Sequence, residues 1–188
     1  MQAIVAVSEN WGIGKDNELL FRISADLKRF RELTAGHTVV MGRKTLESLP
    51  GGKGLPNRRN IVLTSNLDFT AENAEPVCTA AGAVFTAGAD AFVIGGATVY
   101  RQLLSLCDRV YVTKVFASPE ADAFFPNLDE SPDWEVVCES EIMEENGLRF
   151  QYVDYVPRQE EDDDDFLPQI SRPDAFAPVD GFSPFSGF

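Results

Sequence analysis

A chain of 188 residues with 44% apolar side chains is long enough for one domain with a sizeable core, or for one domain and an appendage. Its formal net charge of −14 argues against nucleic acid or an anionic membrane surface as a partner. The three cysteines are odd in number and widely spaced, so we expect neither a disulfide framework nor a metal site, and a reducing cytoplasmic location. The apolar start of the chain lacks a basic flank and predicts neither a signal peptide nor a membrane helix.

Short apolar runs alternate with short amphipathic stretches up to residue 157. We expect strands at 3–7, 38–41, 60–64, 92–94, 109–115, 134–139 and 148–156, and helices at 25–34, 44–49, 80–85 and 98–106. This alternation predicts an α/β fold, with a mainly parallel sheet covered by helices on both faces. The last two strands have no helix between them, and Glu145-Asn146-Gly147 predicts a hairpin that joins them at the sheet edge.

Residues 158–188 have a different composition and contain two Lys/Arg and eight Asp/Glu, so this sixth of the chain carries −6 of the net charge. Six consecutive acidic residues, 160–165, are followed by a stretch rich in proline and phenylalanine. We expect a disordered acidic tail after a domain formed by residues 1–157. The alternative is that the five phenylalanines of the tail dock on a partner or on the domain.

The segment 11–30 places a glycine-containing loop directly before a short amphipathic helix. The first turn of that helix carries one carboxylate, Asp26, beside the apolar Leu27 and Phe30. A lone acid on the wall of an apolar cleft suits a flat, basic, hydrogen-bonding ring. Taken alone, an Asp in a first turn also serves to complement the helix N-terminus.

Two strand-to-helix junctions have features of phosphate sites. The first is Met41-Gly42-Arg43-Lys44-Thr45, and the second runs from Val93 through Gly95-Gly96 to Tyr100. Free N–H groups at helix starts favour anions, although a strand–Gly-Gly–helix junction is also a common tight turn. Because both lie at carboxyl ends of strands, we expect one bisphosphate between them. The spacing is not G-x-G-x-x-G, which argues against an ordinary Rossmann site.

Taken together and in order, these segments resemble the dihydrofolate reductase family over residues 1 to about 157. The resemblance rests on these matches: Gly12-Ile13-Gly14 with Asn17, Asp26 with Leu27 and Phe30, 41–45, Leu55-Pro56 with Arg58, 60–65, Ile94-Gly95-Gly96 with Tyr100, 110–113, and Asp122 ahead of Phe125-Pro126. It implies a three-layer α/β/α fold and NADPH-dependent reduction of 7,8-dihydrofolate to tetrahydrofolate by a cytoplasmic monomer.

The resemblance also implies roles for individual residues. Asp26, held by Thr113, would bind the 2-amino group and N3 side of the pterin, and Phe21 would lie beside it. Arg58 would pair with the α-carboxylate of the glutamate tail, and Leu55 would pack on the benzoyl group. The remaining substrate contacts would come from Ile4, Val5, Ala6, Leu27, Phe30, Leu49 and Ile94.

The implied cofactor site combines the two junctions with the neighbouring strand end. Thr64 and Ser65 would lie near the adenosine 2′-phosphate together with Arg43, although a strand-end turn explains these hydroxyls equally well. The loop 9–22 would close over the nicotinamide and exclude water. The implied cofactor contacts are Ala6, Ile13, Gly14, Gly42, Arg43, Lys44, Thr45, Leu63, Thr64, Ser65, Gly95, Gly96, Ala97, Thr98, Val99 and Tyr100.

Two positions depart from the family pattern. Leu20-Phe21 stands where the family usually has Pro-Trp, and a phenyl ring donates no hydrogen bond to a water near the pterin. Thr98 stands where some relatives carry Arg, which removes one cation from the phosphate environment. Two other functions remain open here: the related pyrimidine reductase of riboflavin synthesis, and a non-catalytic nucleotide-binding scaffold whose tail recruits a partner.

Overall fold

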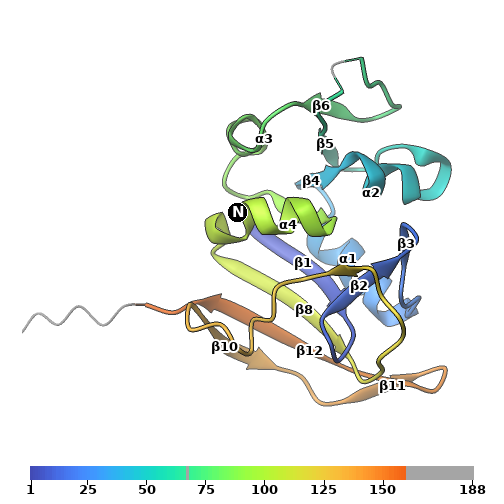
Figure 1. Ribbon diagram of the computed structural model, residues 1–188, viewed down its shortest axis with the longest axis vertical. Coiled ribbons are helices and arrows are strands. Elements are labelled where there is room, and N and C mark those ends of the chain that lie inside the picture. Colours follow the sequence, from blue (N-terminus) through green and yellow to red (C-terminus); the bar gives the residue numbers. More distant parts are fainter. Residues whose placement is uncertain (67, 160–188) are drawn as a thin grey trace, which may run out of the picture. The chain divides into compact units, whose positions relative to one another are not determined.

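A mixed sheet forms the centre of the domain, as the strand pattern predicts (Figure 1). The computed structural model describes residues 1–66 and 68–159, so the predicted tail lies outside the described residues beyond Gln159. Residues Met1–Arg158 form one compact unit. The strand order is β10-β12-β8-β1-β7-β4-β5-β6, and β11 also pairs with β12.

Six strands form the parallel part of the sheet, and the last of them, β8, borders the antiparallel part. These strands are β1 (Gln2–Val7), β4 (Thr38–Gly42), β5 (Arg59–Leu63), β6 (Glu75–Val77) and β7 (Phe92–Gly95), and β8 (Arg109–Val115) pairs parallel with β1. Apolar runs form most of these strands because both faces of such a strand are covered. The exception is β6, which lies at the sheet edge and has the sequence Glu75-Pro76-Val77.

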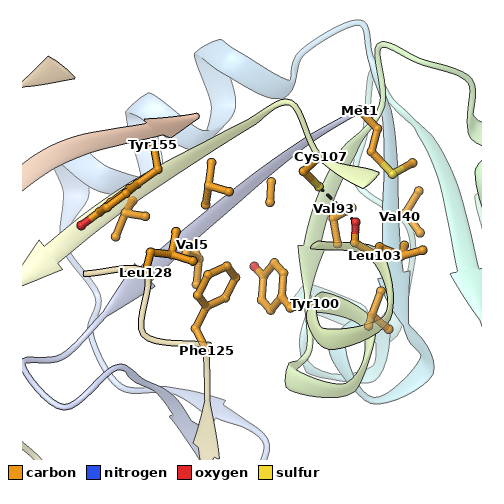
Figure 2. Close-up of a cluster of buried hydrophobic side chains, with 14 of the residues drawn as sticks. Met1, Val5, Val40, Val93, Tyr100, Leu103, Cys107, Phe125, Leu128 and Tyr155 are labelled. Carbon is orange, nitrogen blue, oxygen red and sulfur yellow. Dashed lines mark hydrogen bonds between the residues drawn. The ribbon is translucent and has the colours of Figure 1, made fainter. Parts of the chain in front are cut away.

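Alternate residues of these strands enter two different cores. Val40, Ile61 and Val5 belong to one cluster, together with residues of α3 (Ala80–Ala87) and α4 (Ala97–Leu103). Val39, Val62 and Ile4 belong to a second cluster, on which residues of α1 (Ser24–Thr34) and α2 (Arg43–Ser48) pack. The sheet therefore has helices on both faces, and the predicted α/β/α layering is confirmed. Figure 2 shows the first cluster, in which Val5, Tyr100 and Phe125 lie close together.

The antiparallel side differs from the predicted hairpin. The Asn146-Gly147 turn joins a short strand, β11 (Met143–Glu145), to β12 (Leu148–Pro157), and β10 (Trp134–Glu139) pairs with the later half of β12. The predicted antiparallel pairing of these two strands at the sheet edge is therefore confirmed, but the turn joins β11 to β12 and does not join β10 to β12 directly. The chain leaves the β12 ladder around Ser140, whose hydroxyl accepts from Tyr152 N–H at 2.9 Å, and then pairs again as β11.

A second, three-stranded sheet, β3-β2-β9, was predicted only as loop. It contains β2 (Gly12–Lys15), β3 (Glu18–Leu19) and β9 (Ala123–Phe124). The other departure is in the last predicted helix, which is α-helical only to Leu103 and continues as a 3₁₀ turn, Leu104–Leu106. A second 3₁₀ turn, Pro50–Gly52, follows α2. No helix in the described part of the chain is long and apolar enough to cross a membrane.

Candidate active site

A cleft of about 940 Å³ opens where the parallel strands β4, β5 and β7 end. Ligands of open α/β sheets bind outside the carboxyl ends of the strands, which is where this cleft lies. Its walls bring together most of the predicted cofactor contacts, namely Gly42, Arg43, Lys44, Thr45, Leu63, Thr64, Ser65, Gly96, Ala97, Thr98 and Val99.

The two predicted phosphate junctions lie against each other at this cleft. Gly95 has φ +138°, a conformation that side-chain-bearing residues rarely adopt, and a Cβ there would lie 3.3 Å from Thr45 Oγ1. A Cβ on Gly42 would lie 3.2 Å from a methyl group of Val99. The start of α2 therefore touches the start of α4, which is the juxtaposition that a shared bisphosphate site needs.

Both cations and hydroxyls line the cleft. Arg43 is exposed and forms a loose ion pair with Glu47 at 3.4 Å. The Thr64 hydroxyl accepts a hydrogen bond from Asn66 N–H at 3.2 Å, so it also makes the strand-end turn that is its simplest explanation. It remains able to donate to an anion, because a hydroxyl both donates and accepts.

Several residues of the cleft were absent from the predicted contacts. Arg101 and Gln102 follow Thr98 by one helical turn, a spacing that could have identified them. Cys78 and Ala80 follow β6, a three-residue strand with no detectable period. Asp122 and Ala123 reach the cleft through the small sheet.

The predicted lid, residues 9–22, contains the hairpin β2–β3. Asn17 Nδ2 donates to Lys44 O at 3.0 Å, and Asp16 N–H donates to Asp122 Oδ2 at 2.9 Å. These bonds tie the hairpin to α2 and to the segment before β9. Ile13 and Gly14 lie on β2 but do not line the cleft.

Asp26 lies in the first turn of α1 and is partly buried against the sheet. Thr113 of β8, itself 1% exposed, donates its hydroxyl hydrogen to Asp26 Oδ1 at 2.5 Å. Burial raises the pKa of the Asp26 carboxyl, while the Thr113 hydroxyl and the charge of Arg29 act against this rise. The carboxylate is thus held in one orientation by a neutral donor.

The predicted apolar walls lie mostly on one face of the sheet. Phe30, Leu49 and Ile94 are half-buried and pack on the cluster that contains Ile4. The side chain of Val5 points into the other core, so only its backbone can belong to the site (Figure 2).

Two further predicted contacts, Ala6 and Gly95, do not line the cleft. Leu27 is 43% exposed and Leu55 is half-buried. The backbone N–H of Leu55 donates to Asn60 Oδ1 at 2.8 Å, which fixes the segment leading to Arg58.

Tyr100 is buried in the α3/α4 core instead of lining the cleft. Its hydroxyl donates to Ile4 O at 2.6 Å. A carbonyl oxygen has two lone pairs, so Ile4 O can accept a second hydrogen bond from a ligand.

Arg58 is held by three acceptors before any ligand arrives. Its Nε donates to Thr34 Oγ1 at 2.8 Å, Nη1 donates to Pro56 O at 2.6 Å, and Nη2 donates to Arg31 O at 3.3 Å. The guanidinium lies 5.8 Å from the centre of the Phe30 ring. Burial and the neighbouring Arg31 lower its pKa, so a carboxylate ligand would relieve an unfavourable environment.

Phe21 is half-buried and packs on the small cluster of Ile23, Val115 and Phe150. This cluster lies at the start of α1 and the end of β8, close in sequence to both Asp26 and Thr113. Within residues 1–66 and 68–159, no group of three or more His, Cys, Asp or Glu side chains is arranged to hold a metal ion.

Comparison with known proteins places this site in a family. The family description "Dihydrofolate reductase" matches residues 1–157. The dihydrofolate reductase of Bacillus subtilis is 38% identical over 151 residues, which cover 79% of this chain and 88% of that protein. That of Neisseria meningitidis is 38% identical over 155 residues, covering 81% and 95%.

A solved structure agrees with the sequence comparison. It is the dihydrofolate reductase from Enterococcus faecalis complexed with NADP(H) and RAB-propyl, with a TM-score of 0.73 and 34% identity, covering 84% of this chain and 96% of that one. The predicted resemblance and fold are therefore confirmed: this chain belongs to the dihydrofolate reductase family.

Proposed function

We infer that the chain catalyses the NADPH-dependent reduction of 7,8-dihydrofolate to 5,6,7,8-tetrahydrofolate. Family membership over residues 1–157 supports the reaction, and the relative complexed with NADP(H) supports the cofactor. The observation that carries the substrate is the Asp26–Thr113 pair at 2.5 Å on the apolar face that holds Phe30. The related pyrimidine reductase and the non-catalytic scaffold are not favoured by these relatives.

The cleft fits NADPH in size and in chemistry. Its volume of about 940 Å³ lies in the usual range of ligand sites, which is about 300–1,000 Å³. Arg43, Lys44 and Arg101 supply positive charge, and the hydroxyls of Thr45, Thr64, Ser65 and Thr98 supply further donors. When bound, the cofactor supplies a hydride to C6 of the pterin.

The protein contributes orientation and electrostatics to this transfer. Asp26 accepts hydrogen bonds from the 2-amino group and N3 side of the pterin, and Thr113 keeps its carboxylate in place. N5 of the pterin must gain a proton, but Asp26 faces the opposite side of the ring. Asp26 therefore favours the protonated pterin through its charge, while a water delivers the proton.

The glutamate end of dihydrofolate binds beside Arg58. Arg58 forms a paired hydrogen bond with the α-carboxylate of the glutamate, since its fork is already oriented by Thr34 and Pro56. Leu55 packs on the benzoyl group. The β2–β3 hairpin, tied to Lys44 and Asp122, excludes water from the reacting atoms.

The cysteines of the chain support a proposal for the location of the enzyme in the cell. Cys78, Cys107 and Cys138 all lie in the described part of the chain and are free thiols. This supports a reducing cytoplasmic location. We further propose that the enzyme acts as a monomer, without nucleic acid or membrane as partner.

Steady-state oxidation of NADPH tests the proposed function. The full chain should consume NADPH when dihydrofolate is added, and should not do so with the diaminopyrimidine ribose phosphate that a pyrimidine reductase uses. Turnover of the pyrimidine substrate alone would transfer the assignment to that enzyme. Binding of NADPH without turnover of either substrate would favour the scaffold.

A further inference from the structure

Arg29 is a cation enclosed between α1 and the antiparallel side of the sheet. Its side chain is 18% exposed, and Nη2 donates to Asp154 Oδ1 at 2.7 Å. Nη1 is buried and finds no hydrogen-bond partner within the described residues. Burying a charge costs free energy unless it is fully paired, so one ion pair leaves part of this cost uncompensated.

The strands that contact Arg29 also contact Asp26, through Thr113 of β8. In the antiparallel pair β8–β12, Thr113 lies opposite Tyr152, and Tyr111 lies opposite Asp154. Residues two apart in a strand share a face, so these four side chains form one patch. The patch, called here the α1 platform, consists of Tyr111, Thr113, Tyr152 and Asp154.

Helix α1 contacts the α1 platform at two places. Asp26 accepts from Thr113, and three residues later Arg29 pairs with Asp154 while its guanidinium lies 4.2 Å from the centre of the Tyr152 ring. The helix that carries the acid is thus fixed by one polar contact and one ionic contact.

Tyrosines and carboxylates of the described residues lie near Asp26 and Arg29. Burial raises the pKa values of Tyr100 and Tyr152, so both stay neutral at physiological pH. The Tyr111 ring centre lies 5.5 Å from the Arg29 guanidinium. Glu145 of β11 lies at the start of α1 and carries negative charge. Asp154 is compensated by Arg29 and, at 3.5 Å, by Arg109. Arg29 is the cation whose charge acts to stabilise the ionised Asp26.

We propose that Arg29 is a positioning residue for the reduction: its ion pair with Asp154 and its contact with the Tyr152 ring hold the Asp26 helix on the α1 platform and place a cation one helical turn after the carboxylate. The proposal rests on the function proposed for Asp26. It assigns to a buried ion pair behind the site a control over the pH range in which the acid is ionised.

Two substitutions, one on each side of the ion pair, distinguish an effect of the Arg29 charge on Asp26 from a loss of structural support for α1. Arg29→Gln removes the cation near Asp26, whereas Asp154→Asn removes an anion and leaves Arg29 charged. A purely structural contact would respond in the same way to both substitutions. Control by charge predicts that the pKa of Asp26 rises in the first variant and is unchanged or lower in the second.

The measurement is a carbon NMR titration of the Asp26 carboxyl in the full-length protein without ligands, with Asp26→Asn to assign the resonance. We expect Arg29→Gln to raise the pKa of Asp26 by about one unit. Arg29→Lys should restore most of the wild-type value. The matched control is Arg109→Gln, which removes the outer partner of Asp154 and should leave Asp26 unchanged.

Equal shifts in Arg29→Gln and Asp154→Asn, or no shift in Arg29→Gln, would overturn the proposal. Arg29→Met, which keeps an unbranched stem over Tyr152, provides the same comparison if the Gln variant does not fold. The titration reads the carboxyl whether or not the protein reduces dihydrofolate. A failure here is therefore distinct from a failure of the proposed function, which NADPH oxidation reports.

Discussion

At the scale of a single residue, two opposing effects act on the charge of the Asp26 carboxyl. Burial disfavours its charge, and the Thr113 hydroxyl and Arg29 recover part of that cost. A raised pKa in the folded state means that the ionised carboxyl destabilises the fold at pH values above that pKa. The destabilisation disappears as pH falls and the group becomes protonated.

The first prediction follows from this balance. Asp26→Asn keeps an oxygen for the Thr113 hydroxyl but removes the buried charge. Its melting temperature at neutral pH should therefore equal that of the wild type or exceed it by a few degrees, measured by circular dichroism. The difference should vanish in acid, where the wild-type carboxyl is also neutral. A melting temperature clearly below wild type at neutral pH would show that the charge stabilises the fold.

Arg43 gives a second prediction at this scale. It is an exposed cation at the cleft, with Thr64 and Ser65 on the neighbouring strand end. A hydrogen bond to a charged group contributes about 1.5–3 kcal/mol, so Arg43→Ala should lower kcat/KM for NADPH about 10- to 100-fold. NADH, which lacks the 2′-phosphate, is the internal control and should be affected little. Equal losses with both cofactors would place the 2′-phosphate elsewhere.

At the scale of elements, α1 begins without a side-chain cap of its own. Its N-cap is Ile23, and the missing acceptor comes from β11, where Glu145 accepts from Ser24 N–H at 2.6 Å and from Ala25 N–H at 3.0 Å. These backbone hydrogen bonds lower the pKa of Glu145. The hairpin β11–β12 thus completes the start of the helix that carries Asp26.

A third prediction tests this cap. Glu145→Ala should lower the melting temperature by a few degrees at neutral pH, because two N–H groups lose their acceptor. A carboxyl with a lowered pKa contributes stability that is present above its ordinary pKa and is lost as pH falls through its folded-state pKa. The deficit should accordingly shrink in acid. Glu144→Ala is the matched control, and a similar loss there would argue against a specific cap.

The elements that the sequence predicted are those with a clear period and sufficient length. Helix α1 and strands such as β4 and β8 were predicted to within one or two residues, because their apolar residues recur at helical or strand spacing. The strands β2, β3, β6, β9 and β11 have two to four residues each and, unlike the four-residue β7, contain no run of three apolar residues. The sequence does contain one signal for the β2–β3 hairpin, the dipeptide Asp16-Asn17. Both residues have positive φ in the structure, as the two central residues of a tight hairpin turn require.

The candidate site could be predicted where a local motif contains the function. The Gly42–Thr45 and Gly95–Gly96 junctions were such motifs, and both reach the cleft through Gly42 and Gly96. Arg101 lines the cleft because of its position on α4. The side chain of Val5 points into the other core because successive residues of a strand face opposite sides of the sheet. The pairing of Arg29 with Asp154 joins residues 125 apart, so no local pattern could contain it.

At the scale of the whole molecule, the acidic tail and the domain make separate contributions to charge. The compact unit extends to Arg158, whose N–H donates to Asp133 O at 2.8 Å. The residues after Gln159 lie outside the described part of the chain, so their predicted role rests on composition.

The fourth prediction concerns this tail. Removal of residues 160–188 changes the formal charge from −14 to −7 and leaves the Arg158 contact intact. Turnover and melting temperature should stay nearly unchanged, since a run of six acidic residues resists packing. A melting temperature lower by several degrees would instead support docking of the tail phenylalanines, as would protection of 166–188 in amide exchange.

The central claim is that the charge of Asp26 sustains dihydrofolate reduction at neutral pH. The most direct test is the pH dependence of the single-turnover hydride-transfer rate in wild type and Asp26→Asn, each saturated with NADPH. We predict a loss of about 10²- to 10⁴-fold in the variant at neutral pH. The loss should diminish toward acid, where the free pterin is already protonated. A variant with wild-type rates at neutral pH, or a loss that is the same at every pH, would contradict this account.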